Sequence, residues 1–300
     1  MKVTGVGVVS PSPDPEEVSL DRRTLLLRRA VVPPTIPARE ARRLTRTALL
    51  ALAACKDALG DASVEGTGIA LGSGFGSVEA TRLALEGLFE RADLVSPSHF
   101  VASVRHDAAG TVARLLGLRG PSVATSARRL SFEQALGWAL VQLRRGRTRA
   151  VVVAGADEVT PVLARALARG RLHRELIVWG EGAGALLLES ERSERPALAR
   201  IERFVEGAGT VDELVEAIRR SCGAAFDLVL TDEDGSARRA RAAERVAAAF
   251  SCEKRAPRCG HLSSGGALVA VEAVREGKGR VLCYAREADG PFCAYVVERP

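Results

Sequence analysis

Hydrophobic and polar positions follow two patterns along the chain, one typical of buried strands and the other of amphipathic helices. Residues 149–158, RAVVVAGADE, form a nearly continuous apolar run, as expected for a strand in a sheet that is covered on both faces. Residues 38–59 instead place apolar side chains at helical spacing on one face, which predicts an amphipathic helix. Because segments of the two kinds alternate, the pattern predicts an α/β protein.

The first part of the chain reads as an ordered series of such elements. A short strand at 3–9 is followed by a proline-rich loop that extends to about residue 37. After the helix at 38–59, we expect a strand at 68–74, helices at 78–90 and 99–116, a strand at 123–126 with a helix behind it, and strands at 149–158 and 179–190.

The alternation starts again after Pro196. The expected elements are a strand at 197–209, a helix at 211–221, a strand at 226–231, helices at 237–250 and 261–275, and a closing pair of strands at 279–285 and 292–298. No polar linker separates the two series. We therefore expect an N-terminal half, residues 1–194, and a C-terminal half, residues 195–300, that form one compact unit.

Residues 120–146, GPSVATSARRLSFEQALGWALVQLRRG, combine a strand, a sharp turn and a helix. Ser131 and Gln134 fit a capping box at the start of that helix. A strand that delivers a residue to a helix N-terminus is where many enzymes place a nucleophile, but this turn carries Arg128 and Arg129. Two arginines are electrostatically unfavourable there, so the turn needs solvent exposure, an acidic neighbour or an anionic ligand.

Composition and charge argue against several classes of function. The chain has 43 basic and 37 acidic residues, a formal charge of +6, and only 4% aromatic residues. The aromatic residues do not interleave with the arginines, so stacking on nucleic acid has little support. No apolar run is long enough to span a bilayer, and the N-terminus lacks the features of a signal peptide. We therefore expect a cytoplasmic protein that binds neither nucleic acid nor membranes.

Cysteines and glycines add no cofactor site to this picture. The six cysteines form no C-x-x-C pair, which in a cytoplasmic chain predicts buried thiols. Cys252, Cys259 and His261 lack a fourth ligand at zinc spacing, so no metal site is expected. The glycines of GSGFGS, residues 72–77, do not have G-x-G-x-x-G spacing and predict a tight turn rather than a nucleotide site. No cofactor is expected.

Eight segments, in the correct order, resemble the β-ketoacyl synthases of the thiolase fold. Among them are VTGVGVVSP at 3–11, GIALGSGFGS at 68–77, RAVVVAGADE at 149–158, WGEGAGALLLE at 179–189 and CGHLSSGGALVAVEAV at 259–274. The resemblance covers nearly the whole chain and implies a thiolase-like five-layered α/β/α/β/α sandwich of two related halves. It also implies decarboxylative condensation of acyl thioesters, which needs a cysteine nucleophile and two histidines.

Counting along the resemblance locates the family's catalytic positions in this chain. The nucleophile position falls on Arg129, or on Ala127 if the strand is shortened by two residues. The first histidine position falls on Thr231, with Asp234 as a gapped alternative. Only His261 keeps the residue type that the family uses. An arginine cannot act as a nucleophile, so we expect no catalytic residue at these positions.

A preserved scaffold around a lost nucleophile is similar to the chain-length factors of type II polyketide and fatty-acid-like pathways. The resemblance implies an active β-ketoacyl synthase as a heterodimer partner, contacted through residues 123–126, and an acyl carrier protein as a second partner. Two alternatives stay open. One is a malonyl-thioester decarboxylase or condensing acyltransferase that uses His261, and the other is a non-catalytic homodimeric binding protein. Ser126 is the only hydroxyl near the turn on the strand side, and without a partnering base it is a poor nucleophile.

Overall fold

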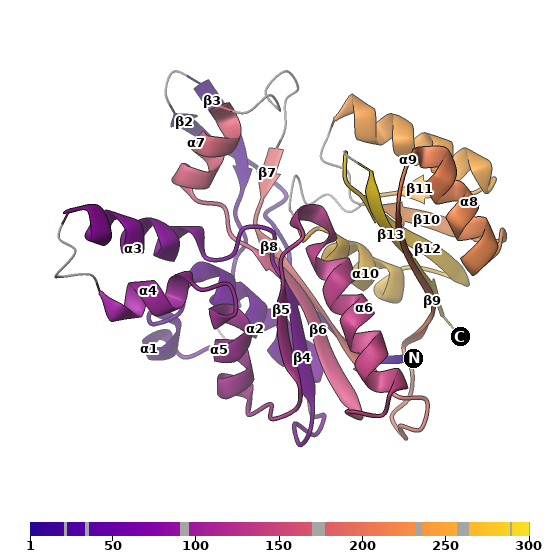
Figure 1. The fold of residues 1–300 in the computed structure, drawn as a ribbon, viewed down its shortest axis with the longest axis horizontal. Coiled ribbons are helices and arrows are strands. Elements are labelled where there is room, and N and C mark those ends of the chain that lie inside the picture. The colour runs from indigo at the N-terminus through magenta and orange to yellow at the C-terminus, as the bar shows by residue number, and fades with distance from the viewer. Residues whose placement is uncertain are drawn as a thin grey trace.

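The protein is described by a computed structural model that covers residues 1–20, 23–33, 36–90, 96–169, 178–231, 236–256, 264–288 and 290–299. Ten strands of these residues form one sheet (Figure 1). The first half of the chain supplies β1 (Lys2–Val9), β4 (Gly68–Gly72), β5 (Ser122–Thr125), β6 (Ala150–Asp157) and β8 (Gly182–Glu189). The second half supplies β9 (Ala199–Ala208), β10 (Leu228–Thr231), β11 (Glu253–Arg255), β12 (Arg280–Arg286) and β13 (Pro291–Glu298).

The two sets of five strands have the same order. The first set runs β5-β4-β6-β8-β1 and the second runs β11-β10-β12-β13-β9. In both sets the first three of these strands are parallel, and the fourth is antiparallel to both of its neighbours. A short antiparallel pairing of β1 with β9 joins the sets, with Lys2 opposite Arg200 and Val3 opposite Ala199. This repeat agrees with two related halves, while a boundary at residue 194 stays a prediction.

Helices add three layers to the two halves of the sheet. The central layer consists of α6 (Ser131–Arg144) and α10 (Gly266–Arg275), whose buried side chains share one core with strands of both halves. Each half also has a second core on the face of its strands that points away from α6 and α10. In the first half this core contains side chains of α2 (Arg46–Leu59) and α5 (Asp107–Leu116), and in the second half it contains side chains of α8 (Val211–Cys222) and α9 (Ala237–Ala249). The expected α/β/α/β/α layering is confirmed, and Figure 1 shows α6 and α10 in the middle of the molecule.

A small second sheet projects from the body beside α7 (Pro161–Arg169) (Figure 1). It consists of β2 (Glu16–Leu20), β3 (Arg23–Arg28) and β7 (Val178–Gly180), and we call it the arm. The remaining helices are α1 (Ala38–Ala41), α3 (Val78–Glu90) and α4 (Pro97–Ser103). The expectation of a loop from residue 10 to 37 is therefore wrong in part, because an antiparallel hairpin lies within it. Among the described helices, none is long and apolar enough to cross a membrane.

Three elements that were expected to be continuous are divided. The helix at 38–59 breaks before Thr45, whose hydroxyl accepts the N–H of Ala48 at 3.2 Å and caps α2. The helix at 99–116 breaks after Val104, which has an extended backbone. The strand at 179–190 divides at Glu181 into β7 and β8. Hydrophobic spacing continues across each break, so only the local hydrogen bonds reveal it.

Candidate functional site

The turn between β5 and α6 is closed by the side chain of the first helical residue. After β5, the chain passes through a single 3₁₀ turn, η2 (Arg128–Leu130), before α6 begins. The Ser131 hydroxyl accepts the N–H of Ala127 at 2.9 Å and donates to the carbonyl of Arg128 at 2.6 Å. The capping box expected from Ser131 and Gln134 is wrong: α6 has Leu130 at its N-cap, and the Ser131 hydroxyl faces back into the turn.

A glycine lets the end of β4 lie directly against this turn. A Cβ on Gly72 would lie 2.4 Å from the carbonyl carbon and oxygen of Ser131, which is closer than any real contact. The expectation of a tight turn within residues 72–77 is confirmed at Gly76, whose φ is +69°. In the glycine-rich segment, Gly72 therefore allows close packing against the start of α6, and Gly76 allows the turn.

Arg128 and Arg129 differ in exposure at this turn. The Arg129 residue is only 4% exposed, and its backbone N–H donates to Oε1 of Glu287 at 2.8 Å. The side chain of Arg128 is 62% exposed, and its Nε lies 3.8 Å from the same Glu287 oxygen. Arg128 also holds a φ of +51°, a conformation that costs free energy for a non-glycine residue. Glu287 is therefore an acidic neighbour of the Arg128 guanidinium, and it also binds the backbone of Arg129.

A second buried carboxylate belongs to Glu133, in the first turn of α6. Glu133 is 1% exposed, and a Cβ on Gly266 at the start of α10 would lie only 1.8 Å from its Oε1. Glycine at position 266 is therefore what allows this carboxylate to sit between the two central helices. The sequence pattern gave no sign of Glu133, because it occupies a polar position of a helix that is buried on nearly all sides.

The other predicted catalytic positions are only partly described. Thr231 is the last residue of β10 and is buried. His261, Asp234 and Cys259 lie outside the described residues. In the part of the chain that the structure describes, no group of three His, Cys, Asp or Glu side chains is arranged to hold a metal ion.

Ser126 follows β5 directly and is engaged by its neighbours. Its hydroxyl accepts a hydrogen bond from Arg105 Nη1 at 2.5 Å and donates to the Gly74 carbonyl at 3.3 Å. A serine that acts as a nucleophile needs a base that takes its proton. A protonated guanidinium and a backbone carbonyl do not supply that base, so these contacts favour a structural role for Ser126.

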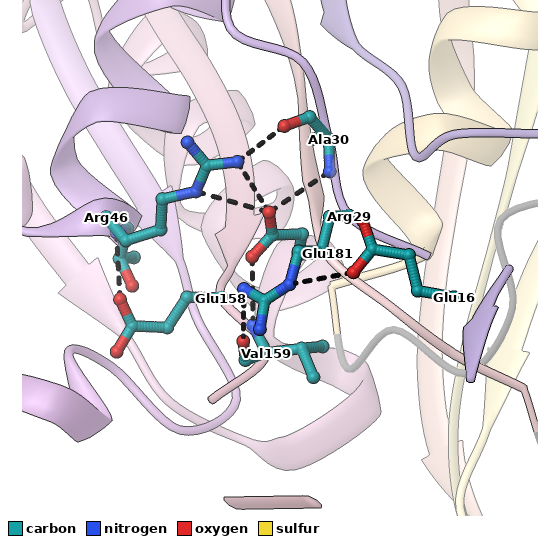
Figure 2. Close-up of polar contacts among 8 residues, drawn as sticks. Glu16, Arg29, Ala30, Arg46, Glu158, Val159 and Glu181 are labelled. Carbon is teal, nitrogen blue, oxygen red and sulfur yellow. Dashed lines mark hydrogen bonds and ion pairs between the residues drawn. The ribbon is translucent and has the colours of Figure 1, made fainter. Parts of the chain in front are cut away.

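A buried network that the sequence analysis missed ties the arm to the body (Figure 2). Glu181 is fully buried, and its carboxylate accepts the backbone N–H groups of Ala30 at 3.1 Å and Val159 at 3.3 Å. Arg46, at the start of α2, donates to the same carboxylate through Nε at 3.2 Å and Nη2 at 2.5 Å. An acidic residue within the apolar run at 179–189 is the signal that could have revealed it.

Glu158 and Asp157 extend the buried acidic groups at the end of β6. Glu158 accepts the backbone N–H groups of Thr47 and Glu79 at 3.3 and 3.0 Å. Burial raises the pKa of its carboxyl, and the nearby Glu181 carboxylate adds to the increase. Asp157 accepts the Ser73 hydroxyl at 2.8 Å and the Gly74 N–H at 2.9 Å, and so fixes the glycine-rich turn.

A surface pocket of about 660 Å³ lies between α1, with the connection that follows it, and helices α4 and α5. Arg39, Arg43 and Arg114 line it together with Glu40 and Asp107, and apolar side chains form the rest of its wall. All three arginines are exposed. Its charged groups therefore suit a ligand or partner that combines negative charge with apolar surface.

Comparison with known proteins identifies the family. The sequence profile described as "Beta-ketoacyl synthase, N-terminal domain" matches residues 33–194, which is more than half of the chain. The chain belongs to the β-ketoacyl synthase family. The 3-oxoacyl-[acyl-carrier-protein] synthase 2 of Staphylococcus aureus is 29% identical over 205 residues, covering 59% of this chain and 50% of the relative. The chain thus spans about half the length of the curated relatives it matches.

Solved ketosynthase structures match the fold over the whole chain. One is a type II polyketide synthase acyl-carrier protein in complex with its ketosynthase bound to the hexaketide, with a TM-score of 0.80, 18% identity, and coverage of 100% of this chain and 99% of that chain. Another is a ketosynthase in complex with its chain length factor from Xenorhabdus doucetiae, with a TM-score of 0.77, 15% identity, and coverage of 100% and 98%. The fold is therefore the thiolase fold expected from the sequence.

Burial makes the described thiols of this chain weaker acids than a free cysteine. Burial raises the pKa of Cys55 to about 12, and burial is also the main cause of the raised pKa values of Cys222 and Cys252. It raises the pKa values of Cys283 and Cys293 as well, with the Glu133 carboxylate adding to the increase. A thiolate is the reactive form of cysteine, so burial lowers the reactivity of these five described thiols.

Proposed function

We propose that the chain is a non-catalytic subunit that pairs with an active β-ketoacyl synthase, in the manner of a chain-length factor. The observation that carries this proposal is Arg129 at the turn before α6, where counting along the family resemblance expects the nucleophile. A guanidinium stays protonated at physiological pH and has no lone pair to attack a thioester. The Arg129 amide is also engaged, because it donates to the Glu287 carboxylate at 2.8 Å.

The two ends of the ten-stranded sheet differ in a way that favours pairing through β5. The end strand β11 carries Glu253, Lys254 and Arg255 in sequence, and charged side chains protect an edge from further pairing. The opposite end strand β5 has the sequence SVAT, with no charged residue and with partly exposed side chains. A partner strand can therefore add to β5 without burying a charge, as β-augmentation requires.

Six exposed apolar side chains lie on α3 and α4 or directly after α4, and we call them the α3–α4 patch: Leu85, Leu88, Phe89, Phe100, Val101 and Val104. Phe89 and Phe100 are 84% and 63% exposed, and exposed apolar patches mark interaction sites. Arg105 directly follows the patch and donates to Ser126, directly after β5. We therefore include this α3–α4 patch in the subunit interface with the synthase.

The arginine-lined pocket beside α4 supports an acyl carrier protein as the second partner. Carrier proteins present their acyl group on a phosphopantetheine group, which joins an anionic phosphate to the thioester. Arg39, Arg43 and Arg114 supply positive charge around a partly apolar pocket that suits such a group. Electrostatic complementarity of this kind speeds and orients docking, and it weakens as the salt concentration rises.

A catalytic assay separates this proposal from an enzymatic role. The purified chain is incubated with malonyl-loaded carrier protein, and carbon dioxide release and acyl transfer are measured. We expect neither above the background rate, whereas decarboxylation that disappears in His261→Ala would establish a malonyl-thioester decarboxylase instead. The chain mixed with its partner synthase is expected to form product that neither subunit forms alone.

An interface experiment tests the pairing. Phe100→Asp places a charge within the α3–α4 patch, and Val31→Asp does the same at a residue that is 82% exposed and outside the patch. We expect Phe100→Asp to abolish the complex with the synthase in size-exclusion chromatography and Val31→Asp to leave it intact. Equal binding by both variants would remove the patch from the interface.

A further inference from the structure

The turn between β5 and α6 holds a carboxylate from a distant part of the chain. Glu287 belongs to the connection between β12 and β13, 158 positions from Arg129, whose N–H it accepts. It also lies 3.8 Å from the Arg128 guanidinium. One carboxylate oxygen thus faces an amide donor and a guanidinium, the groups with which proteins recognise bound carboxylates.

The Glu287 side chain is nearly buried beside the turn. The Glu287 side chain is 9% exposed. Leu130, Ala285 and Cys293 form a small buried apolar cluster beside the same turn. A buried carboxylate needs polar partners, and the Arg129 amide and the Arg128 guanidinium are such partners here.

The segment that carries Glu287 is held at both of its sides. The N–H of Glu287 donates to the Pro291 carbonyl at 2.8 Å, which closes the connection between the two strands. Arg238 of α9 donates to the Ala288 carbonyl at 3.0 Å, and the Gly209 N–H donates to the Gly290 carbonyl at 2.9 Å. Glu287 and its described neighbours Ala288 and Gly290 are therefore each hydrogen-bonded to other parts of the protein.

We propose that Glu287 is an internal ligand that fills a carboxylate-binding site at the Ala127–Leu130 turn. The site would take a small carboxylate, such as the malonyl end of a thioester, once the Glu287 side chain is removed. The inference rests on the proposed function, because it takes this turn to be the former acyl site of the family. It adds the reason why the site is closed: the chain supplies its own anion.

Carboxylate rescue of a truncated side chain tests this inference. Glu287→Ala is compared with Glu276→Ala, which removes an exposed carboxylate that also lies 3.8 Å from an arginine, Arg255. Thermal unfolding is followed in sodium acetate, sodium malonate and sodium chloride at equal ionic strength. For Glu287→Ala, we expect a lowered Tm that acetate or malonate raises by about 3 °C when present at tenfold its Kd.

The outcomes are distinct. In wild type and Glu276→Ala, acetate and malonate are expected to raise the Tm no more than chloride does. If the Tm of Glu287→Ala also rises no more in carboxylate than in chloride, the inference is overturned. Glu287→Gln keeps a hydrogen-bond acceptor in place, so it is expected to fold and to show no carboxylate response; a response equal to that of Glu287→Ala would contradict the internal-ligand assignment.

Glu287→Gln also gives a readout if Glu287→Ala does not fold. The Arg129 amide is expected to show one of the largest ¹H–¹⁵N shifts between wild type and Glu287→Gln, and an unchanged Arg129 amide would overturn the inference. None of these assays contains a synthase or a thioester. Failure here therefore leaves the pairing proposal intact, and failure of pairing leaves the internal ligand intact.

Discussion

The buried Glu181–Arg46 pair provides a quantitative test of how the arm is attached. Replacing Glu181 with alanine removes the acceptor of two backbone N–H groups and of the Arg46 guanidinium. Breaking a buried pair by removing one partner costs about 3–5 kcal/mol. Because the Arg46 side chain is 35% exposed, its guanidinium can regain water, so we expect about 3 kcal/mol, at the lower end of that range.

Urea unfolding measures this loss, with an exposed ion pair as the control. Asp212 pairs with Arg245 at 2.6 Å, but the two side chains are 80% and 57% exposed. Asp212→Ala is therefore expected to cost about 1 kcal/mol at most. Unfolding is followed by circular dichroism and by tryptophan fluorescence, because Trp179 of β7 is 3% exposed and adjoins Glu181. A Glu181→Ala loss no larger than that of Asp212→Ala would refute the anchoring role of the pair.

Three further predictions follow from particular contacts. Gly72→Ala should lower the free energy of unfolding by about 3 kcal/mol or more, because the added Cβ would meet the backbone of α6. Gly146 has a φ of +65° and open space around it, so Gly146→Ala should lower it by about 1 kcal/mol. Urea unfolding of both variants measures the difference. Burial raises the pKa of Glu158, so the folded state binds that proton more tightly than the unfolded state does. The wild type should therefore gain stability relative to Glu158→Gln as the pH falls through the raised pKa toward 4.5. Parallel pH profiles of stability for the two proteins would contradict this. Arg39→Glu with Arg43→Glu should weaken carrier-protein binding on the order of tenfold and flatten its salt dependence, measured by titration at several salt concentrations.

The sequence pattern predicted the parts of the fold that depend on long apolar runs. The strand at 150–157 is buried at every position, so composition alone distinguishes it. Helix α6 follows from its spacing of apolar residues. The β2–β3 hairpin was missed because prolines and charged residues dominate residues 10–37, and its third strand, β7, comes from a segment about 150 positions away. Pairing at that distance leaves no local signature.

The residues of the candidate site also differ in whether local sequence order could predict them. Arg129 was reached by counting residues from a strand to a helix, which depends only on local order. Its partner Glu287 could not be found in this way, because the pairing of β12 with β13 brings it to the turn from 158 positions away. Glu133 and Glu181 were missed for a related reason: their burial depends on how layers pack, and a polar residue gives no sign of burial until those layers meet.

The composition of the native complex tests the central claim most directly. The tagged chain is isolated from its native host, its bound proteins are identified by mass spectrometry, and the intact assembly is weighed by native mass spectrometry. The account predicts a one-to-one heterodimer with a β-ketoacyl synthase that carries a cysteine nucleophile. A homodimer of this chain, or a chain that releases carbon dioxide from malonyl carrier protein by itself, would contradict it.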